Sequence, residues 1–315
     1  MRIGIVVDSA CDLPLDYLRQ HGIILLPITV KIGDAVLADH RNEDATLQFL
    51  DEHVATRGAE AETQPFTVQQ VQDLFLKRLV IDYDYVFCMT ITRTRSPIFD
   101  NTQQASFAIL NDYKEPRAAA GITTPFALRV IDTQSLFAGQ GVTAVEAVRL
   151  RDAGEGAPKI RARIENLALH THAYMVPRDL HYLRARTRHR GDRSVSLLSA
   201  TLGSALDIKP VLHCNRGETG PVAKVKGFEA ATAKMFDHAI RQIRARRLLT
   251  PTLCLSYGGA LAEMRALPAY QRLRDAAAEA NVEVHESLMS LTGMVNVGKG
   301  ALALGFAAEG ATFEV

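Results

Sequence analysis

Hydroxyl and acidic side chains follow three short apolar runs of this 315-residue chain, at the point where each run ends. Residues 3–7 are followed by Asp8 and Ser9, residues 85–89 by Thr90, Thr92, Thr94 and Ser96, and residues 127–131 by Asp132 and Thr133. Short apolar runs separated by helix-like segments indicate strands of a parallel α/β sheet. Because such strands end at one shared edge, where ligands bind, we expect these side chains to line one cleft. A cleft lined by hydroxyls, with no strong base or glycine-rich phosphate loop, suits the binding of a ligand better than its conversion.

Two hydroxyl residues precede expected helices and could together hold an anion. Thr63 and Gln64 precede Pro65 and one helix, and Ser96 precedes Pro97 and another. A helix cap for Thr63 and a turn for Ser96 are the common alternatives. Considered together, both hydroxyls would lie at helix N-termini beside the sheet edge, where backbone N–H groups attract a carboxylate.

Three patterns match catalytic motifs only in part. Asp8 and Asp12 lie four positions apart, whereas an aspartyl phosphotransferase usually has two acids one residue apart. Ser96 does not lie in a G-x-S-x-G turn. Residues 293–299 fit G-x-x-x-x-G-K, but Gly300 stands where Ser or Thr is required. An enzyme that uses Asp8 for phosphoryl transfer or Ser96 for acyl hydrolysis therefore stays the alternative to a binding protein.

The histidines, cysteines and arginines give few further candidates. Ten histidines show no metal-ligand spacing and the four cysteines form no C-x-x-C pair, so we expect no metal, no cofactor and buried free thiols. Arg188, Arg190 and Arg193 belong to a dense basic stretch. Such a stretch is either a solvated loop or a docking site for a phosphate or a protein partner.

Composition bounds the class of protein. A hydrophobic fraction of 47% and a charged fraction of 23% are ordinary for a globular protein, and the length suits two domains. The net charge of +1 gives no electrostatic case for nucleic-acid binding. No apolar stretch approaches the roughly 18 residues that span a bilayer. The chain passes from Met1 directly into a strand, so we expect a cytoplasmic protein.

Strand and helix patterns alternate along the first half of the chain. A strand is expected at 23–30, helices at 43–56, 67–81, 102–113 and 140–152, and Asp12 is expected to cap a helix that begins at residue 13. Residues 154–158 gather helix breakers and indicate a boundary between an N-terminal α/β domain, 1–156, and a second α/β domain, 157–315. In the second half we expect helices at 158–171, 228–247 and 259–279, and strands around 211–212 and at 253–257.

Five segments, in order along the chain, resemble the DegV family. Residues 6–14 are similar to the family motif V-T-D-S-T-A-D-L-P, and residues 63–65 to T-S-Q-P. Ser96 falls at the second serine of S-S-x-L-S-G-T-Y-Q-S-A. Residues 132–141 match D-S-x-x-x-x-x-G-Q-G, and residues 202–212 resemble L-G-x-L-L-x-I-K-P-I-L.

This resemblance implies a two-domain α/β protein that buries a long-chain fatty acid between the domains, with the second domain covering the acyl chain. The carboxylate would be bound by Thr63 and Ser96, and the neighbours of the head group would be Asp8, Ser9, Gln64 and Asn296. Family members act as the non-catalytic, acyl-binding subunit of a fatty acid kinase and carry the acyl phosphate towards phospholipid synthesis.

The chain departs from the family pattern around the expected head group. Asn296 stands where the family has a histidine, and residues 99–101 replace S-G-T. The G-G-R-I segment is expanded and basic, with Arg193 as the match for its arginine. A lipid-responsive protein whose basic stretch docks a partner other than a kinase is therefore a further alternative.

Overall fold

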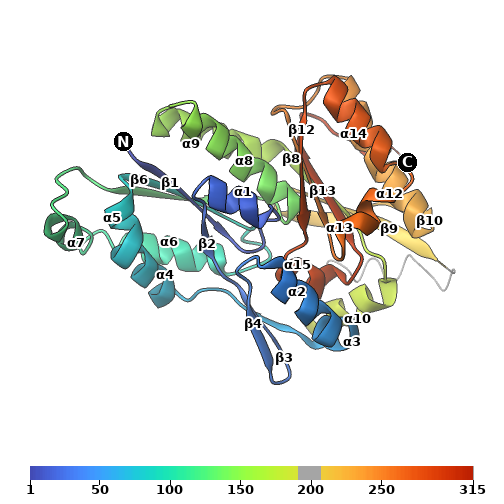
Figure 1. Ribbon diagram of the computed structural model, residues 1–315, viewed down its shortest axis with the longest axis horizontal. Coiled ribbons are helices and arrows are strands. Elements are labelled where there is room, and N and C mark those ends of the chain that lie inside the picture. Colours follow the sequence, from blue (N-terminus) through green and yellow to red (C-terminus); the bar gives the residue numbers. More distant parts are fainter. Residues whose placement is uncertain (191–206, 315) are drawn as a thin grey trace.

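A four-stranded parallel sheet forms the first half of the molecule (Figure 1). The computed structural model describes residues 1–190 and 207–314. The strand order is β2-β1-β6-β7, with β1 at Ile3–Asp8, β2 at Ile24–Leu26, β6 at Tyr85–Thr90 and β7 at Ala127–Asp132. The three strands expected from apolar runs are thus confirmed. Thr90 pairs with Asp132, so the polar residues after these strands meet at one edge.

Helices form near the expected 43–56 and 67–81, whereas the helix expected at 102–113 lies at Ile98–Ala108 and the helix at Lys114–Ala119 was not expected. The helices of this half are α1 at Leu15–Gln20, α2 at Glu43–Phe49, α3 at Ala55–Arg57, α4 at Val68–Leu74, α5 at Val80–Asp82, α6 at Ile98–Ala108 and α7 at Lys114–Ala119. A π-helical segment joins α2 to α3 at Leu50–Val54, and another joins α4 to α5 at Phe75–Leu79. The expected cap at Asp12 is wrong: Pro14 precedes α1 as its N-cap, and Asp12 is fully buried.

A small antiparallel sheet, β4-β3-β5, extends from the parallel sheet. It consists of β3 at Thr29–Ile32, β4 at Ala35–Ala38 and β5 at Glu62–Gln64. The single strand expected at 23–30 is therefore two strands, β2 and β3, that belong to different sheets. Pro27 lies at the break, and proline has no N–H with which to continue a ladder.

A six-stranded mixed sheet forms the second half, in the order β10-β9-β8-β13-β11-β12. The strands are β8 at Thr171–Val176, β9 at Ile208–Asn215, β10 at Glu218–Lys226, β11 at Thr252–Tyr257, β12 at Glu283–Leu288 and β13 at Leu302–Ala307. Helices α12 (Phe228–Arg244) and α14 (Tyr270–Glu279) cover one face (Figure 1). The helix expected at 259–279 is interrupted near Pro268, which separates α13 (Leu261–Arg265) from α14.

Helix α8, Ala138–Asp152, packs against both large sheets. It contacts β8, β11 and β13 of the mixed sheet and β1 of the parallel sheet, and nearly all its residues are buried. A turn at 153–156 separates α8 from α9, Ala157–His170. The fold is therefore α/β with a parallel-sheet domain and a mixed-sheet domain. The division at residue 156 stays a prediction, because α8 belongs to the packing of both.

The basic stretch begins on a helix. Helix α10 spans Leu180–Arg190, so Arg188 and Arg190 lie in its last turn, whereas Arg193 and residues 202–206 of the family motif lie outside the described residues. The last helix, α15, spans Leu291–Val297.

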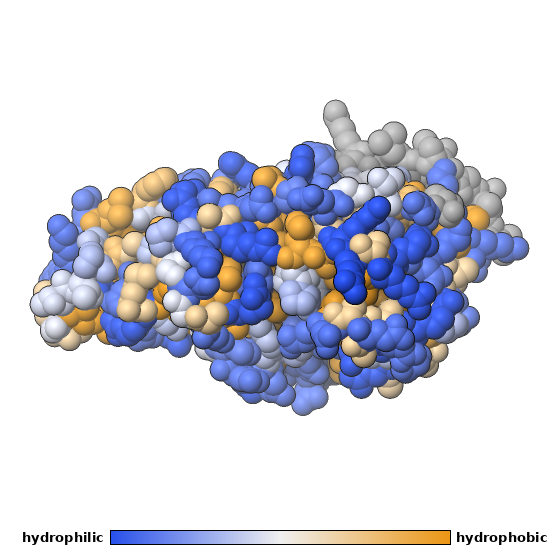
Figure 2. All heavy atoms as spheres, turned by 90° about the horizontal axis from the view of Figure 1, so that it is seen from above, coloured by the Kyte–Doolittle hydropathy of each residue, from blue (hydrophilic) through white to orange (hydrophobic). Residues whose placement is uncertain are grey.

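The surface seen from above is mostly hydrophilic, with hydrophobic residues in small separate groups (Figure 2). In the described part of the chain, no helix is long and apolar enough to cross a membrane. All four cysteines are buried and free, as expected.

Candidate functional site

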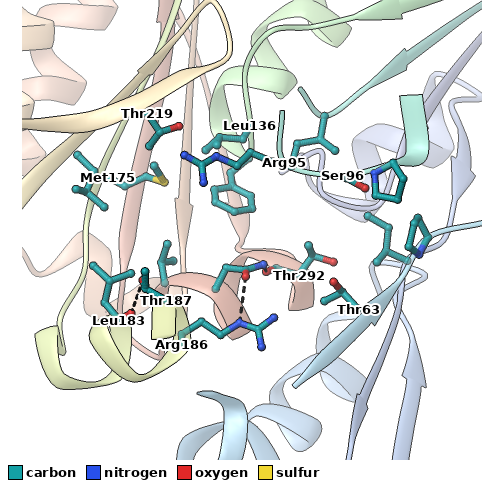
Figure 3. Close-up of a pocket in the computed structure, with 18 residues that line it drawn as sticks. Thr63, Arg95, Ser96, Leu136, Met175, Leu183, Arg186, Thr187, Thr219 and Thr292 are labelled. Carbon is teal, nitrogen blue, oxygen red and sulfur yellow. Dashed lines mark hydrogen bonds between the residues drawn. The ribbon is translucent and has the colours of Figure 1, made fainter. Parts of the chain in front are cut away.

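A cavity of about 270 Å³ lies between the two sheet domains (Figure 3). Both halves of the chain contribute to its wall. Its apolar lining residues are Ile28, Pro65, Ile91, Pro97, Leu136, Phe137, Met175, Leu183, Leu212 and Val297. Its polar lining residues are Thr63, Arg95, Ser96, Arg186, Thr187, Thr219, Thr292 and Asn296. A mostly apolar wall with a few polar groups is typical of a small-molecule site.

Thr63 and Ser96 both line this cavity, on the same side of it (Figure 3). Thr63 lies in strand β5, where it pairs with Val30 of β3. The alternative that Thr63 caps a helix is wrong, since Thr67 caps α4 in a capping box with Gln70. The Ser96 hydroxyl accepts a hydrogen bond from the backbone N–H of Ile98 at 3.3 Å, at the start of α6. The fold thus brings together two hydroxyls that lie 33 positions apart in the sequence.

Asn296 lines the same cavity from α15 and is oriented by hydrogen bonds on both sides of its amide. Its Nδ2 donates to the backbone carbonyl of Thr292 at 2.7 Å. Its Oδ1 accepts a hydrogen bond at 3.2 Å from Nε of Arg186 on α10. An amide held in this way presents a fixed polar surface to the cavity.

Asp8 and Ser9 lie behind the cavity wall and do not line it. Asp8 is fully buried and accepts hydrogen bonds from the N–H groups of Ile91 (2.6 Å) and Ala10 (2.9 Å) and from Nε2 of Gln140 (3.3 Å). Burial raises its pKa to about 6, although these hydrogen bonds favour the charged form. The Ser9 hydroxyl accepts from the N–H of Ile28 at 2.9 Å. Both side chains therefore position residues that do line the cavity, Ile91 and Ile28.

Gln64, the neighbour of Thr63 on β5, does not face the cavity. It is exposed, at the end of β5, and is not one of the residues that line the cavity. The alternation of side chains along a strand explains this, because neighbours on β5 face opposite sides. The motif places Thr63 at the cavity and its neighbour in solvent.

The helix that carries Asn296 is held by acids from the first half of the chain. Asp12 accepts the N–H of Ser290 at 2.8 Å, and Asp39 accepts the N–H of Leu291 at 2.8 Å. Arg41 lies 3.5 Å from Asp12, and all three ionisable side chains are buried. Burial raises the pKa of both carboxyls, and the Arg41 guanidinium opposes that shift. These contacts set the position of α15 relative to the parallel sheet.

Arg95, Arg186 and Thr292 are lining residues that the sequence did not single out as part of the site. Arg186 belongs to the basic stretch, which favours a solvated face, yet it is only 3% exposed. Arg95 directly precedes Ser96, and that proximity is the one signal that could have found it. Thr292 lies in a glycine-containing segment near the end of the chain, with no motif around it.

The cavity wall combines hydroxyl, amide and guanidinium groups with a larger number of apolar side chains. Within residues 1–190 and 207–314, no grouping of three or more His, Cys, Asp and Glu side chains could hold a metal ion. The hydroxyl, amide and guanidinium groups can form hydrogen bonds with the polar end of a ligand, and the apolar side chains can bury its apolar part.

The sequence comparisons extend over almost the whole chain. A family model described as "Uncharacterised protein, DegV family COG1307" matches residues 2–309. A DegV domain-containing protein of Xanthomonas axonopodis pv. citri is 67% identical over 309 residues, which cover 98% of each chain. One from Xanthomonas campestris pv. campestris is 66% identical over 313 residues, which cover 99% of each.

Solved structures share the fold at lower identity. A stearic acid-binding protein from Eubacterium ventriosum has a TM-score of 0.76 at 19% identity, with 98% of each chain covered. DegV from Bacillus subtilis, a fatty acid-binding protein, has a TM-score of 0.75 at 18% identity, with 98% of this chain and 100% of that chain covered. Together with the family model and the two close relatives, this shared fold leads to one conclusion. The chain belongs to the DegV family.

Proposed function

We propose that this protein binds one long-chain fatty acid in the cavity between its domains and has no catalytic activity of its own. The observation that carries the proposal is the cavity itself, with Thr63 and Ser96 on one side and a wall that is apolar at more than half of its lining residues. The fatty acid-binding proteins that share the fold support it.

The apolar tail would supply most of the binding free energy. Burial of about 12 methylenes at ~0.8 kcal/mol each gives roughly 10 kcal/mol before the entropy cost of binding is subtracted. Each hydrogen bond to the charged head group adds only about 1.5–3 kcal/mol. The hydroxyls therefore orient the carboxylate more than they retain the ligand.

Native mass spectrometry of the purified protein, followed by lipid identification after denaturation, tests the proposal. We expect one fatty acid per chain. A protein that is empty and also takes up neither palmitate nor oleate would contradict it. In that case, assays with aryl phosphate and aryl ester substrates would examine the alternative enzymes that use Asp8 or Ser96.

Substitution of either hydroxyl residue by alanine tests whether the hydroxyls mainly orient the carboxylate or mainly retain the fatty acid. We expect Thr63→Ala and Ser96→Ala each to weaken fatty acid binding about tenfold or more, because one charge-assisted hydrogen bond is lost while the buried tail stays. Equilibrium dialysis with labelled palmitate measures this. Ser106→Ala, on α6 but outside the cavity lining, is the matched control. Complete loss of palmitate binding in either single variant would contradict the expectation that the tail supplies most of the binding free energy.

The proposed role is to present the carboxylate to a separate fatty acid kinase in the cytoplasm and to carry the acyl phosphate towards phospholipid synthesis. What supports it is the position of the hydroxyls at the polar end of the cavity. Transfer of labelled phosphate from ATP to bound palmitate, with a bacterial fatty acid kinase catalytic subunit added, tests this step. Binding without transfer would favour a lipid-responsive interaction protein, and charge reversal at Arg188 and Arg190 would then test partner docking.

A further inference from the structure

The cavity wall carries more polar groups than one carboxylate can use. Eight of the eighteen lining residues have polar side chains, and they come from both sheet domains. A carboxylate has only two oxygens, with about four acceptor sites between them. Thr63 and Ser96 lie on one side of the cavity, whereas Thr187 and Thr219 lie on the opposite side, where Met175 also lies (Figure 3). Polar groups therefore border the part of the cavity that would hold the acyl chain.

Thr219 belongs to the face of the mixed sheet that forms this opposite side. It pairs directly with Cys214 of β9, and Leu212 of β9 pairs directly with Met175 of β8. Paired residues of antiparallel strands project from the same face of a sheet, and so do residues two apart on one strand. Thr219, Leu212 and Met175 therefore share one face, and all three line the cavity. A hydroxyl thus lies among apolar side chains.

The hydroxyl of Thr219 has no strong hydrogen-bond partner in the protein. Its Oγ1 is buried, and residues 1–190 and 207–314 leave this atom without a hydrogen bond to nitrogen or oxygen. Its polar neighbour is the thiol of Cys214, and sulfur is only a weak donor and acceptor. That thiol also donates to the carbonyl oxygen of Gln134 at 3.9 Å. Because buried hydroxyls are normally satisfied by protein, water or ligand, Thr219 can both donate to and accept from a ligand.

Thr187 lines the same side of the cavity but uses its proton within its own helix. Its Oγ1 donates to the backbone carbonyl of Leu183, one turn earlier on α10, at 2.8 Å. Such bonds are common for threonine inside helices. Of these two threonines, Thr219 is therefore the one whose hydroxyl proton is left for a ligand.

We propose that the ligand of this cavity is a hydroxylated long-chain fatty acid and that Thr219 binds a chain hydroxyl remote from the carboxylate. The inference rests on the proposed function and deepens it by naming the class of ligand. In a wholly apolar tail pocket, a chain hydroxyl would lose its hydrogen bonds to water without replacement, and the hydroxy acid would bind more weakly than the plain acid. Thr219 supplies the partner that such a pocket lacks.

The experiment measures how well 9-, 12- and 18-hydroxyoctadecanoic acids displace labelled octadecanoic acid from delipidated protein in equilibrium dialysis. For wild type we expect at least one of these three acids to bind as tightly as unlabelled octadecanoic acid or more tightly. Thr219→Val removes the hydroxyl and nearly keeps the shape of the side chain. It should weaken the binding of that hydroxy acid about tenfold relative to octadecanoic acid, the effect of one buried hydrogen bond.

Two variants and one further ligand serve as matched controls. Thr187→Val removes a hydroxyl from the same side of the cavity and should leave the ratio of the two affinities within about twofold, because that hydroxyl is already bonded within α10. Thr219→Ser keeps the hydroxyl and should keep the wild-type ratio. 2-Hydroxyoctadecanoic acid carries its hydroxyl beside the carboxylate, so its affinity relative to octadecanoic acid should not respond to Thr219→Val. Each ratio is measured within one variant, so a partial loss of folded protein does not alter it.

The possible results separate this inference from the proposed function. Weaker binding of all three remote hydroxy acids than of octadecanoic acid by wild type would overturn the inference and leave the proposed function standing. An unchanged ratio in Thr219→Val, or an equal change in Thr187→Val, would also overturn it. If Thr219→Val fails to fold, the wild-type comparison and Thr219→Ser decide. Binding of none of these acids by wild type would overturn the proposed function as well.

Discussion

At the scale of single residues, buried ionisable side chains near the start of the chain bind the backbone near its end. Asp12 and Asp39 accept backbone N–H groups at the start of α15, and Arg41 lies between these acids and the carbonyl of Leu288, to which its Nη2 donates at 2.6 Å. The Arg41 guanidinium lies 3.5 Å from Asp12, and its charge also favours the ionised form of Asp39. Removal of that guanidinium leaves the acids without compensation in a poorly solvated place.

We therefore expect Arg41→Met to destabilise the fold by about 3–5 kcal/mol, measured by urea denaturation, because it breaks a buried ion pair by removing one partner. Arg57→Ala is the matched control. Arg57 pairs with Glu60 on the surface, where the two side chains are 58% and 60% exposed, and its loss should cost under about 1 kcal/mol. Similar losses in the two variants would show that burial does not control the effect of Arg41.

A stack of aromatic and histidine rings fixes α12 on the mixed sheet at the level of elements. The rings of Tyr174 and His213 have centroids 4.6 Å apart, and His238 of α12 packs edge-on against Tyr174 at 5.0 Å. Nδ1 of His172 lies 2.9 Å from Nε2 of His213. Burial lowers the pKa of His213 and of His238 to about 4, since the imidazolium form loses its hydration there.

This stack predicts a pH dependence of stability. A histidine with a pKa of about 4 in the fold and 6.5 in the unfolded chain takes up its proton more readily when unfolded. Stability is therefore fully present above pH 6.5 and is lost as pH falls towards 4, by roughly 2–3 kcal/mol for each histidine. His238→Phe should flatten this decline, measured by denaturant unfolding across the range. Tyr174 keeps its hydrogen bond to the carbonyl of Ala311 in that variant. An unchanged slope would contradict the assignment to His238.

Local sequence patterns predict some helices and strands better than others, and residue composition and burial explain the difference. The three predicted parallel strands read as continuous apolar runs because helices cover them. Strand β13 escaped prediction because its sequence, LALGFA, is rich in small residues with low strand propensity, and burial in the sheet centre decides its conformation. The π-helical segments have no sequence signature, and the split at Pro27 depends on which sheet each half joins.

At the scale of the whole molecule, the cavity depends on α8, which holds the two sheets at a fixed separation. A Cβ atom added at Gly305 of β13 would lie 2.5 Å from the carbonyl carbon and oxygen of Ala138, the first residue of α8. Leu136 and Phe137, which precede Ala138, line the cavity. Close approach of backbone to backbone at Gly305 therefore sets the position of part of the cavity wall.

Gly305→Ala should destabilise the protein by about 1–3 kcal/mol and weaken palmitate binding, because backbone cannot yield as a flexible side chain would. Thermal unfolding and equilibrium dialysis measure the two effects. Gly220→Ala in β10 is the matched control, since a Cβ there meets nothing within 4 Å, and should change stability by under about 0.5 kcal/mol. If Gly305→Ala behaved like the control, α8 would not be constrained by this contact.

The sequence by itself determined the α/β class, the parallel strands with polar residues at their ends, and the DegV family, because these depend on local periodicity and on motifs in a constant order. It also singled out Thr63, Ser96 and Asn296, which the fold brings to one cavity. Only the tertiary structure decided that Asp8 and Ser9 lie behind the wall, that Gln64 faces solvent, and that Arg186 and Thr292 face inward. The physical reason is that packing between segments distant in sequence decides whether a side chain points into the cavity, into the core or into solvent. No pattern around Arg186 distinguishes it from the other arginines of its basic stretch until α10 packs against residues 58–60 and α15.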